Sequence, residues 1–411
     1  MTGYRLPNRG RVDHARPVSF SFDGKSYTGL AGDTLASALL ANGVHLMGRS
    51  FKYHRPRGVV SAGSDEPNAL IGTSRGPGRF EPNTRATLQE LRAGLEATSQ
   101  NRWPSLAFDA GAINDNLGSL FSAGFYYKTF MWPRAFWDRV YEPVIRNAAG
   151  LGVSPSEPDA DSYASRFHHV DVLIVGAGAA GLGTRLAPAQ AVALALVALE
   201  QSVACDGQHC EPGGALLSGP AIVIDGKPAW DWLGQTLAEL GSLPNVTVLP
   251  RTTAIGYYHR NLVGLCQRLT DHLDTVPAGA PRERMWKVRA KEVVLAQGAL
   301  EKPLVFDGND RPGVMLAGAA QTYLHRYGVK VGNHPAIVTA HDSAWYAAFD
   351  LAEAGARPAV IVDIRASVDH ALTDRARALG IETLLGRTVT GTSGRLRVKS
   401  LRVNRVTDGK A

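Results

Sequence analysis

The sequence has 411 residues, of which 45% are hydrophobic and 20% charged, a composition typical of globular proteins with two or three domains. A net charge of +7 is mild for this length and favours anionic small molecules or an acidic partner surface over nucleic acid. Three cysteines, Cys205, Cys210 and Cys266, are too few for a disulfide framework, so we expect a cytoplasmic protein. No signal peptide is expected, and the most apolar run, residues 186–199, is too short to span a membrane.

The N-terminal part of the chain has the pattern of a small β-grasp domain. Residues 18–22 alternate apolar and polar side chains, Asp23 and Gly24 suit a two-residue hairpin turn, and a second short strand returns. A helix over residues 35–41 follows. Because ferredoxin-like domains begin with a hairpin, a helix and a glycine-rich loop, we place such a domain in residues 1–78.

Domains of this kind usually hold a 2Fe–2S cluster on four cysteines. No cysteine precedes Cys205, so we predict a cysteine-free ferredoxin-like domain and no iron–sulfur cluster. The cation-rich loop at residues 48–58 can grip a phosphate or carboxylate, contact another subunit, or remain solvated. The sequence leaves these three alternatives open.

Residues 79–165 are predicted to form a helical connector rich in aromatic residues. Charged side chains interrupt the aromatic ones, so no stretch here suits a membrane helix, and we expect the aromatic rings to pack in a core or an interface. The polar, proline-containing stretch 153–165 marks the boundary with the next domain.

The most informative motif begins with the apolar run 170–175, which ends in a Gly-x-Gly-x-x-Gly turn. A helix and a second apolar strand follow, and Glu200 closes that strand. Strand, glycine turn, helix, strand and acid in this order are the dinucleotide-binding fingerprint of a Rossmann fold. The glycines allow a tight turn, close approach of a pyrophosphate to the backbone, and close packing of the helix on the strand. The motif predicts a bound dinucleotide, with a turn that binds nothing as the alternative.

Residues 166–411 alternate strands and helices, which predicts an FAD/NAD(P)-binding, Rossmann-like α/β domain. The pair Gly213-Gly214, and Gly298 after the strand 293–297, also suit close contact between backbone and cofactor. The full set of expected cofactor-binding residues is Gly176, Gly178, Ala179, Ala180, Gly181, Glu200, Gly213, Gly214 and Gly298.

A second strand–helix–strand unit covers residues from about 330 to 411. Its first turn holds His341, Asp342 and Ser343 where a nucleotide site needs glycines, and bulky side chains block close approach of a pyrophosphate to the backbone. We therefore predict a degenerate unit that keeps the architecture of a second dinucleotide domain without binding a dinucleotide in the usual way.

Several segments together resemble the alpha subunits of heterotetrameric sarcosine oxidase and of related amino-acid and opine oxidases. The resemblance is carried by residues 32–43, 48–58, 65–69, 141–146, 309–315 and 323–328, together with the fingerprint, and it extends over nearly the whole chain. It implies a two-dinucleotide-type α/β domain that carries NAD, with FAD as the alternative occupant. It also implies FMN at the interface with a beta-type flavoprotein subunit, FAD within that subunit, and further small subunits in a hetero-oligomer.

Two departures from this family are expected. Its alpha subunits are considerably longer and end in a folate-binding domain, which this chain is expected to lack. In addition, Pro188 interrupts the helix after the fingerprint and predicts an end near Ala187, because an interior proline costs on the order of 3 kcal/mol. Glu200 also lies one place beyond the family's usual acidic position.

No residue pattern requires a nucleophile, a general base or a metal site, so the catalytic residues are unknown and no metal is expected. The resemblance implies a subunit of a flavin-dependent amine oxidoreductase acting on CH–NH donors, as in the oxidative demethylation of sarcosine. The chain would then bind a dinucleotide and form the electron-transfer interface, while a partner subunit oxidises the amine. The alternatives are a self-sufficient FAD-dependent NAD(P)H oxidoreductase and a non-catalytic scaffold with a dead nucleotide site.

Overall fold

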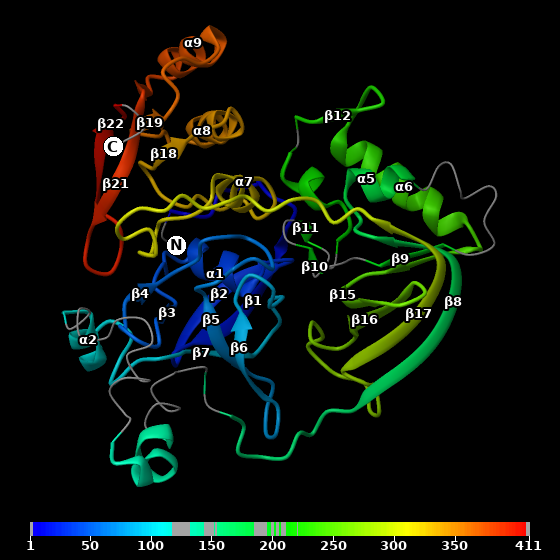
Figure 1. Ribbon diagram of the computed structural model, residues 1–411. Coiled ribbons are helices and arrows are strands. Elements are labelled where there is room, and N and C mark those ends of the chain that lie inside the picture. The colour runs from blue at the N-terminus through cyan, green and yellow to red at the C-terminus, as the bar shows by residue number, and fades with distance from the viewer. Residues whose placement is uncertain are drawn as a thin grey trace.

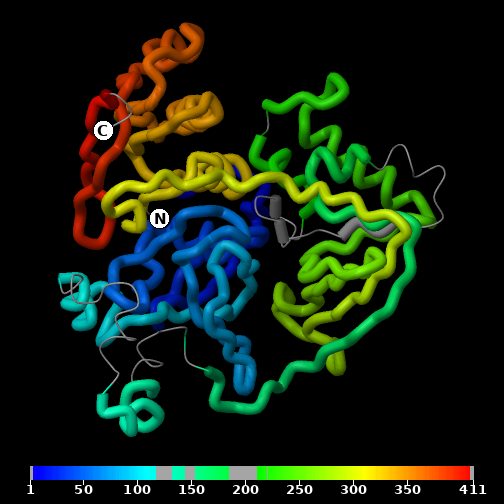
Figure 2. Tube along the Cα trace, viewed as in Figure 1, coloured from blue at the N-terminus to red at the C-terminus, as the bar shows by residue number. Residues whose placement is uncertain are grey.

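The computed structural model describes residues 3–116, 132–143, 152, 154–184, 195–198, 201–202, 205–206, 211–219 and 221–407. Within these residues, three sheets carry the fold: a five-stranded sheet near the N-terminus, a long six-stranded sheet, and a three-stranded sheet near the C-terminus (Figure 1). The segment that follows the six-stranded sheet crosses over the N-terminal domain to reach the C-terminal unit (Figure 2). The N-terminal domain is therefore in position to contact both of the other parts.

The N-terminal sheet has the strand order β2-β1-β7-β5-β6. Its strands are β1 (Asp13–Phe22), β2 (Lys25–Ala31), β5 (Leu70–Ser74), β6 (Phe80–Arg85) and β7 (Leu95–Ser99). The β1–β2 hairpin turns at Asp23 and Gly24, both at positive φ, as predicted. Helix α1 (Leu35–Ala41) is wholly buried, and Thr34 and Ser37 form a capping box at its start.

This sheet extends beyond residue 78, where we placed the domain boundary. Strands β6 and β7 lie in the segment predicted to be a helical connector, and β7 pairs in parallel with β1. Pairing between strands so far apart in the sequence leaves no local signal, so the boundary was placed too early. The described helical pieces of the connector are short: η1 (Ala110–Ala112), α2 (Ile113–Asn116), η2 (Arg134–Phe136) and η3 (Trp137–Tyr141).

The six-stranded sheet has the order β14-β9-β8-β17-β16-β15. Its strands are β8 (Tyr163–Val175), β9 (Ala195–Ala198), β14 (Val246–Leu249), β15 (Thr252–Tyr258), β16 (Leu262–Arg268) and β17 (Glu283–Leu295). The first four in spatial order are parallel, and β17, β16 and β15 are antiparallel. The long strands β8 and β17 pair along their whole length and join the two halves into one curved sheet (Figure 1).

Helices α5 (Ala179–Thr184) and α6 (Ala229–Ser242) and the turn η4 (Gly214–Ser218) accompany the parallel half of this sheet. Ile174, Leu182 and Trp232 belong to the core on that side, and Leu173 and Trp286 to the core on the opposite face. Residues on both faces of β8 are therefore buried, as expected for a parallel strand. Pro188 and the helix end predicted near Ala187 lie outside the described residues.

The C-terminal unit contains the parallel strands β18 (Ala336–Thr339), β19 (Val360–Asp363) and β20 (Glu382–Leu385), with helices α8 (Ser343–Glu353) and α9 (His370–Ala378). Helix α7 (Ala317–His325) precedes it. The two-stranded pairs are β3 (Gly48–Arg49) with β4 (Pro56–Arg57), β10 (Gln201–Ser202) with β11 (Cys205–Asp206), β12 (Val223–Ile224) with β13 (Lys227–Pro228), and β21 (Arg387–Ser393) with β22 (Ser400–Arg405). The predicted strand–helix–strand unit is thus present as β18, α8 and β19.

Candidate functional site

The fingerprint turn connects the end of β8 to the start of α5, and at two of its positions the backbone is packed too tightly for a side chain. Gly176 has φ +110°, and a Cβ added there would lie 2.2 Å from the Ala296 carbonyl oxygen. A Cβ added at Gly181 would lie only 1.8 Å from the Gly176 carbonyl oxygen. Both positions therefore require glycine, one for its conformation and the other for the close passage of helix and strand.

The other predicted glycines gather at the same edge of the sheet. The Gly213 amide donates to the Ala177 carbonyl oxygen at 2.9 Å, which joins the fingerprint turn to η4. Gly213, Gly214 and Gly298 all have positive φ, and Gly298 follows β17, the neighbour of β8. The structure thus brings these three glycines to the turn that contains Gly176, Gly178, Ala179, Ala180 and Gly181. Glu200 lies outside the described residues.

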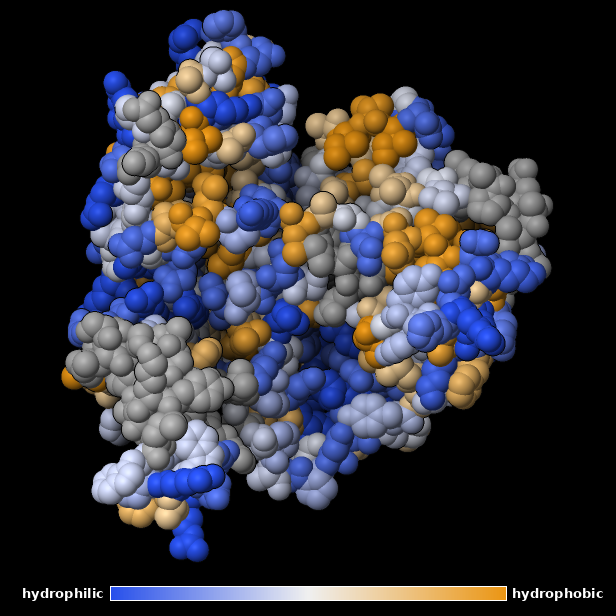
Figure 3. All heavy atoms as spheres, viewed as in Figure 1, coloured by the Kyte–Doolittle hydropathy of each residue, from blue (hydrophilic) through white to orange (hydrophobic). Residues whose placement is uncertain are grey.

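A cleft of about 750 Å³ opens beside these glycines. Ala215, which follows Gly214, and Ala299, which follows Gly298, line one wall. Residues 61–63 of the N-terminal domain, together with α7 and α8, line the others. In the space-filling view the surface is hollowed between the C-terminal unit and the lobe that carries α5 and α6 (Figure 3). Nucleotides bind to open α/β sheets at this kind of place, outside the carboxyl ends of the strands.

A group of polar side chains in the cleft comes from α7 and α8, and no sequence pattern indicated them. His325 Nε2 lies 2.9 Å from Asp350 Oδ2, and Gln321 donates to the same oxygen at 2.8 Å. Burial alone would raise the pKa of Asp350, but hydrogen bonds from His325 and Gln321 outweigh it and hold the pKa below its ordinary value. Glu301 accepts hydrogen bonds from Ala317 and Gly318, so its carboxylate caps the start of α7.

In the C-terminal unit, the acid that ends the second strand bonds to side chains of the same unit. Asp363, at the end of β19, accepts from Trp345 Nε1 at 2.8 Å and from Arg365. Arg365 also donates to Asp342 at 2.7 Å, so that acid is held inside the unit. Burial opposes ionisation of Asp363, but these hydrogen bonds outweigh it and keep its pKa below the ordinary value. That this unit binds no dinucleotide in the usual way stays a prediction.

Three arginines of the cation-rich loop bond to groups of this chain. Arg49 donates to the Leu106 carbonyl oxygen, Arg55 pairs with Asp115 at 2.6 Å, and Arg57 pairs with Asp310. These arginines pack against neighbouring segments of the same chain. The structure therefore does not favour any of the three alternatives for this loop in a form that needs the arginines to be free. The described residues contain no helix long and apolar enough to cross a membrane.

The fold is similar to that of a solved dehydrogenase. The solved L-proline dehydrogenase from P. horikoshii matches with a TM-score of 0.56 at 17% identity, over 98% of this chain and 59% of that one. At such low identity the likeness concerns the fold alone. It supports the predicted Rossmann-like architecture.

Sequence comparison points to a particular group of proteins. The chain is 54% identical to the alpha subunit of sarcosine oxidase from Rhizobium meliloti (strain 1021), over 90% of this chain and 37% of that protein. It is 36% identical to the alpha subunit of sarcosine oxidase from Corynebacterium sp. (strain P-1), over 95% of this chain and 35% of that protein. An opine oxidase subunit of Agrobacterium tumefaciens (strain Ach5) is 30% identical over 47% of this chain and 36% of its own length. The predicted resemblance is confirmed, and the chain spans little more than a third of the length of these relatives.

One prediction needs correction. Residues 15–102 match the family model of a 2Fe–2S iron–sulfur cluster binding domain, which contradicts the expectation of a chain without an iron–sulfur cluster. The sequence places no cysteine in this segment. The donor set present therefore does not fit a cluster held by four thiolates, and no chemical step here is derived through one.

Proposed function

We propose that this chain is the dinucleotide-binding part of an alpha subunit in a flavin-dependent amine oxidoreductase of the sarcosine oxidase type. The observation that carries the proposal is the glycine turn at the carboxyl edge of a parallel sheet, where Gly176 and Gly181 let strand and helix pass too closely for any side chain. The similarity to sarcosine oxidase alpha subunits over nearly the whole chain supports it.

The dinucleotide would be held by the glycines of the fingerprint turn, by the pair Gly213-Gly214 and by Gly298. The far half of the dinucleotide would reach into the cleft lined by Ala215 and Ala299. Amine oxidation by a flavin is hydride removal from the carbon next to nitrogen, and the flavin carries that chemistry. In this proposal small subunits and a beta-type flavoprotein subunit complete the enzyme. The amine, such as sarcosine, is oxidised in the partner.

Titration calorimetry of the purified chain with NAD and with FAD tests the site. Gly181→Ala introduces a methyl group against the Gly176 carbonyl, so we expect at least roughly tenfold weaker binding and a loss of about 1–3 kcal/mol of stability. Gly183→Ala is the matched control, because nothing lies within 4 Å of that position in the same helix. It should leave affinity unchanged and add a few tenths of a kcal/mol to about 1 kcal/mol of stability.

The outcomes separate the alternatives. A chain that binds neither NAD nor FAD contradicts the proposal and favours a scaffold. A chain that retains FAD and oxidises NAD(P)H without a partner favours a self-sufficient oxidoreductase. Co-expression with a beta subunit of sarcosine oxidase, followed by an assay for sarcosine oxidation, tests the assignment to a hetero-oligomeric amine oxidase.

A further inference from the structure

A buried carboxylate lies at the centre of the loop that follows β4. Glu66 is 1% exposed, and both of its carboxylate oxygens point at the backbone of its own loop. Oε2 accepts from the amides of Val60 and Ser61, each at 2.8 Å. Oε1 accepts from the amides of Asn68 at 2.7 Å and Ala69 at 2.9 Å. Four backbone N–H groups thus converge on one anion.

The positions in this loop have the spacing of a plant-type 2Fe–2S ligand set. The first three cysteines of such a set follow the pattern Cys-x4-Cys-x2-Cys, with a fourth further along the chain. Ser61, Glu66 and Ala69 have this spacing here. Thr87 is fully buried and its hydroxyl donates to the Gly63 carbonyl oxygen at 2.7 Å, which places a fourth side chain at the same loop.

Converging backbone N–H groups form an anion-binding concavity, a device that many iron–sulfur sites use. A buried charge is costly unless hydrogen bonds satisfy it, and Glu66 has four. We propose that the Glu66 carboxylate is the anion bound by this loop. It occupies the place where a loop with this ligand spacing would hold an iron–sulfur cluster on cysteine thiolates. Burial raises the pKa of the Glu66 carboxyl, and the four amides act against that rise.

The bound carboxylate also fixes one wall of the cleft. The Val60 carbonyl oxygen accepts from the Leu316 amide at 2.9 Å, and the Ser61 carbonyl oxygen accepts from the Tyr323 hydroxyl at 3.0 Å. Two of the four residues whose amides bind Glu66 therefore dock the loop onto α7, one before its first residue and the other near its end. Through them, Glu66 positions the cleft wall formed by residues 61–63. This inference does not depend on which dinucleotide binds.

The first experiment restores thiols to the loop of the full chain. One variant carries Ser61→Cys, Glu66→Cys, Ala69→Cys and Thr87→Cys, and its matched control carries the same changes but keeps Glu66. Both, and the native loop, are made with Cys205→Ser, Cys210→Ser and Cys266→Ser, so that iron cannot be held by thiols elsewhere. After anaerobic reconstitution with ferrous iron and sulfide, iron content and electron paramagnetic resonance of the reduced protein are measured.

We expect about two iron atoms per chain and a 2Fe–2S signal in the four-cysteine variant, with several-fold less in the control that keeps Glu66. Cluster uptake by the native loop overturns the proposal, because the carboxylate would then not occupy the site. A four-cysteine variant that is folded by circular dichroism yet takes up no cluster overturns it as well.

A second measurement decides the matter if the four-cysteine variant does not fold. In Glu66→Gln an amide group faces N–H donors, so the amides of Val60, Ser61, Asn68 and Ala69 should exchange hydrogen roughly tenfold faster or more. Glu96→Gln, at an exposed position on β7, is the matched control and should leave these rates unchanged. Unchanged protection of the four amides in Glu66→Gln contradicts the proposal.

Discussion

At the scale of single residues, a buried histidine links the stability of this protein to pH. His45 is 8% exposed, and its ring meets that of Tyr4 edge-on at a centroid distance of 5.3 Å. Its Nε2 makes no hydrogen bond within the described part of the chain. Burial, with a smaller effect of the positive charge on Arg397, lowers the pKa of His45 from 6.5 to about 4.

Because this pKa is lower in the folded chain, the unfolded chain binds the extra proton between about pH 6.5 and pH 4. Stability should therefore fall as the pH is lowered through this window, by up to about 3 kcal/mol from this residue. His45→Leu should flatten the dependence, as measured by urea unfolding at a series of pH values. His259→Leu, an exposed control, should not. An unchanged slope in His45→Leu would show that other groups control the acid sensitivity.

The residues of the candidate site differ in how well the sequence could predict them. Gly176 and Gly181 were predictable because the turn they form is local and tolerates no side chain. His325 and Asp350 were not, because they lie on different helices and meet only through packing of α7 on α8. Glu66 was missed for another reason: between Asp65 and Pro67 it has the pattern of an exposed turn. Only the ligand spacing from Ser61 could have revealed it.

At the scale of elements, the C-terminal strand–helix–strand unit keeps its architecture, but the acidic residue at the end of its second strand, Asp363, bonds to other side chains of the unit. Asp363 is fully buried and satisfies the indole N–H of Trp345. Asp363→Ala should therefore cost about 2 kcal/mol, because it leaves that N–H buried without a partner. The affinity for NAD or FAD should stay the same. Thermal unfolding and titration calorimetry measure the two effects, and a large loss of affinity would place the dinucleotide in this unit instead.

Which strands exist was easier to predict than how they pair. The alternation in β1 and the apolar run at the end of β8 are local patterns, and both strands are present. The sequence did not show that β8 begins at Tyr163, inside the expected linker, because its first half has few apolar residues. That half is held by pairing with β17, more than a hundred residues later in the chain.

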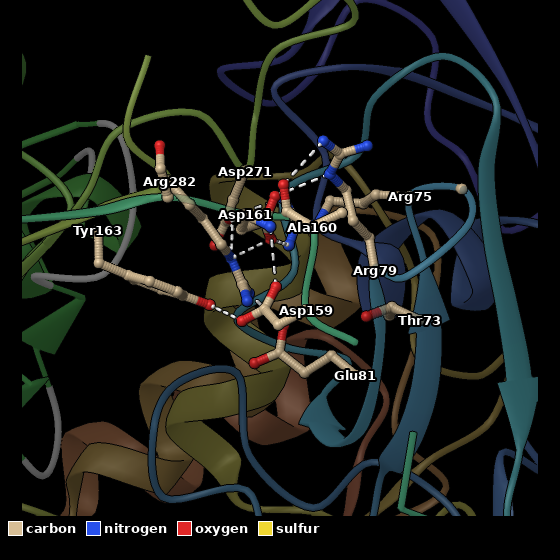
Figure 4. Close-up of polar contacts among 12 residues, drawn as sticks. Thr73, Arg75, Arg79, Glu81, Asp159, Ala160, Asp161, Tyr163, Asp271 and Arg282 are labelled. Atoms are coloured by element: carbon tan, nitrogen blue, oxygen red, sulfur yellow. Dashed lines mark hydrogen bonds and ion pairs between the residues drawn. The ribbon is translucent and has the colours of Figure 1, made fainter. Parts of the chain in front are cut away.

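At the scale of the whole molecule, a network of ion pairs joins the N-terminal domain to the six-stranded sheet (Figure 4). Arg282, just before β17, pairs with Asp271 at 2.9 Å and also with Glu81 of β6. Asp161, just before β8, accepts from Arg75 at 2.5 Å and from Arg79 at 2.8 Å. Arg75, Asp161, Asp271 and Arg282 are largely buried, whereas Arg79 and Glu81 are partly exposed. Removal of one of the buried charges leaves its buried partners uncompensated.

Arg282→Met should destabilise the protein by about 3 kcal/mol, because three acidic side chains lose a shared cation. Arg377→Met is the control: its pair with Asp374 is exposed on α9 and should be worth less than about 1 kcal/mol. Urea unfolding followed by circular dichroism gives both values. Equal, small losses in the two variants would show that the network contributes no more than a surface pair.

The hydrophobic core of the N-terminal domain does not end at that domain. Buried side chains of α1, α7 and α8, among them Leu39, Tyr323 and Trp345, belong to one continuous cluster, whereas those around α6 and β16 form separate ones. Segments from the two ends of the chain must therefore melt together. A calorimetric scan should resolve two transitions, one for this shared body and one for the nucleotide sheet, and residues 1–102 expressed without the remainder should fail to acquire a cooperative transition of their own.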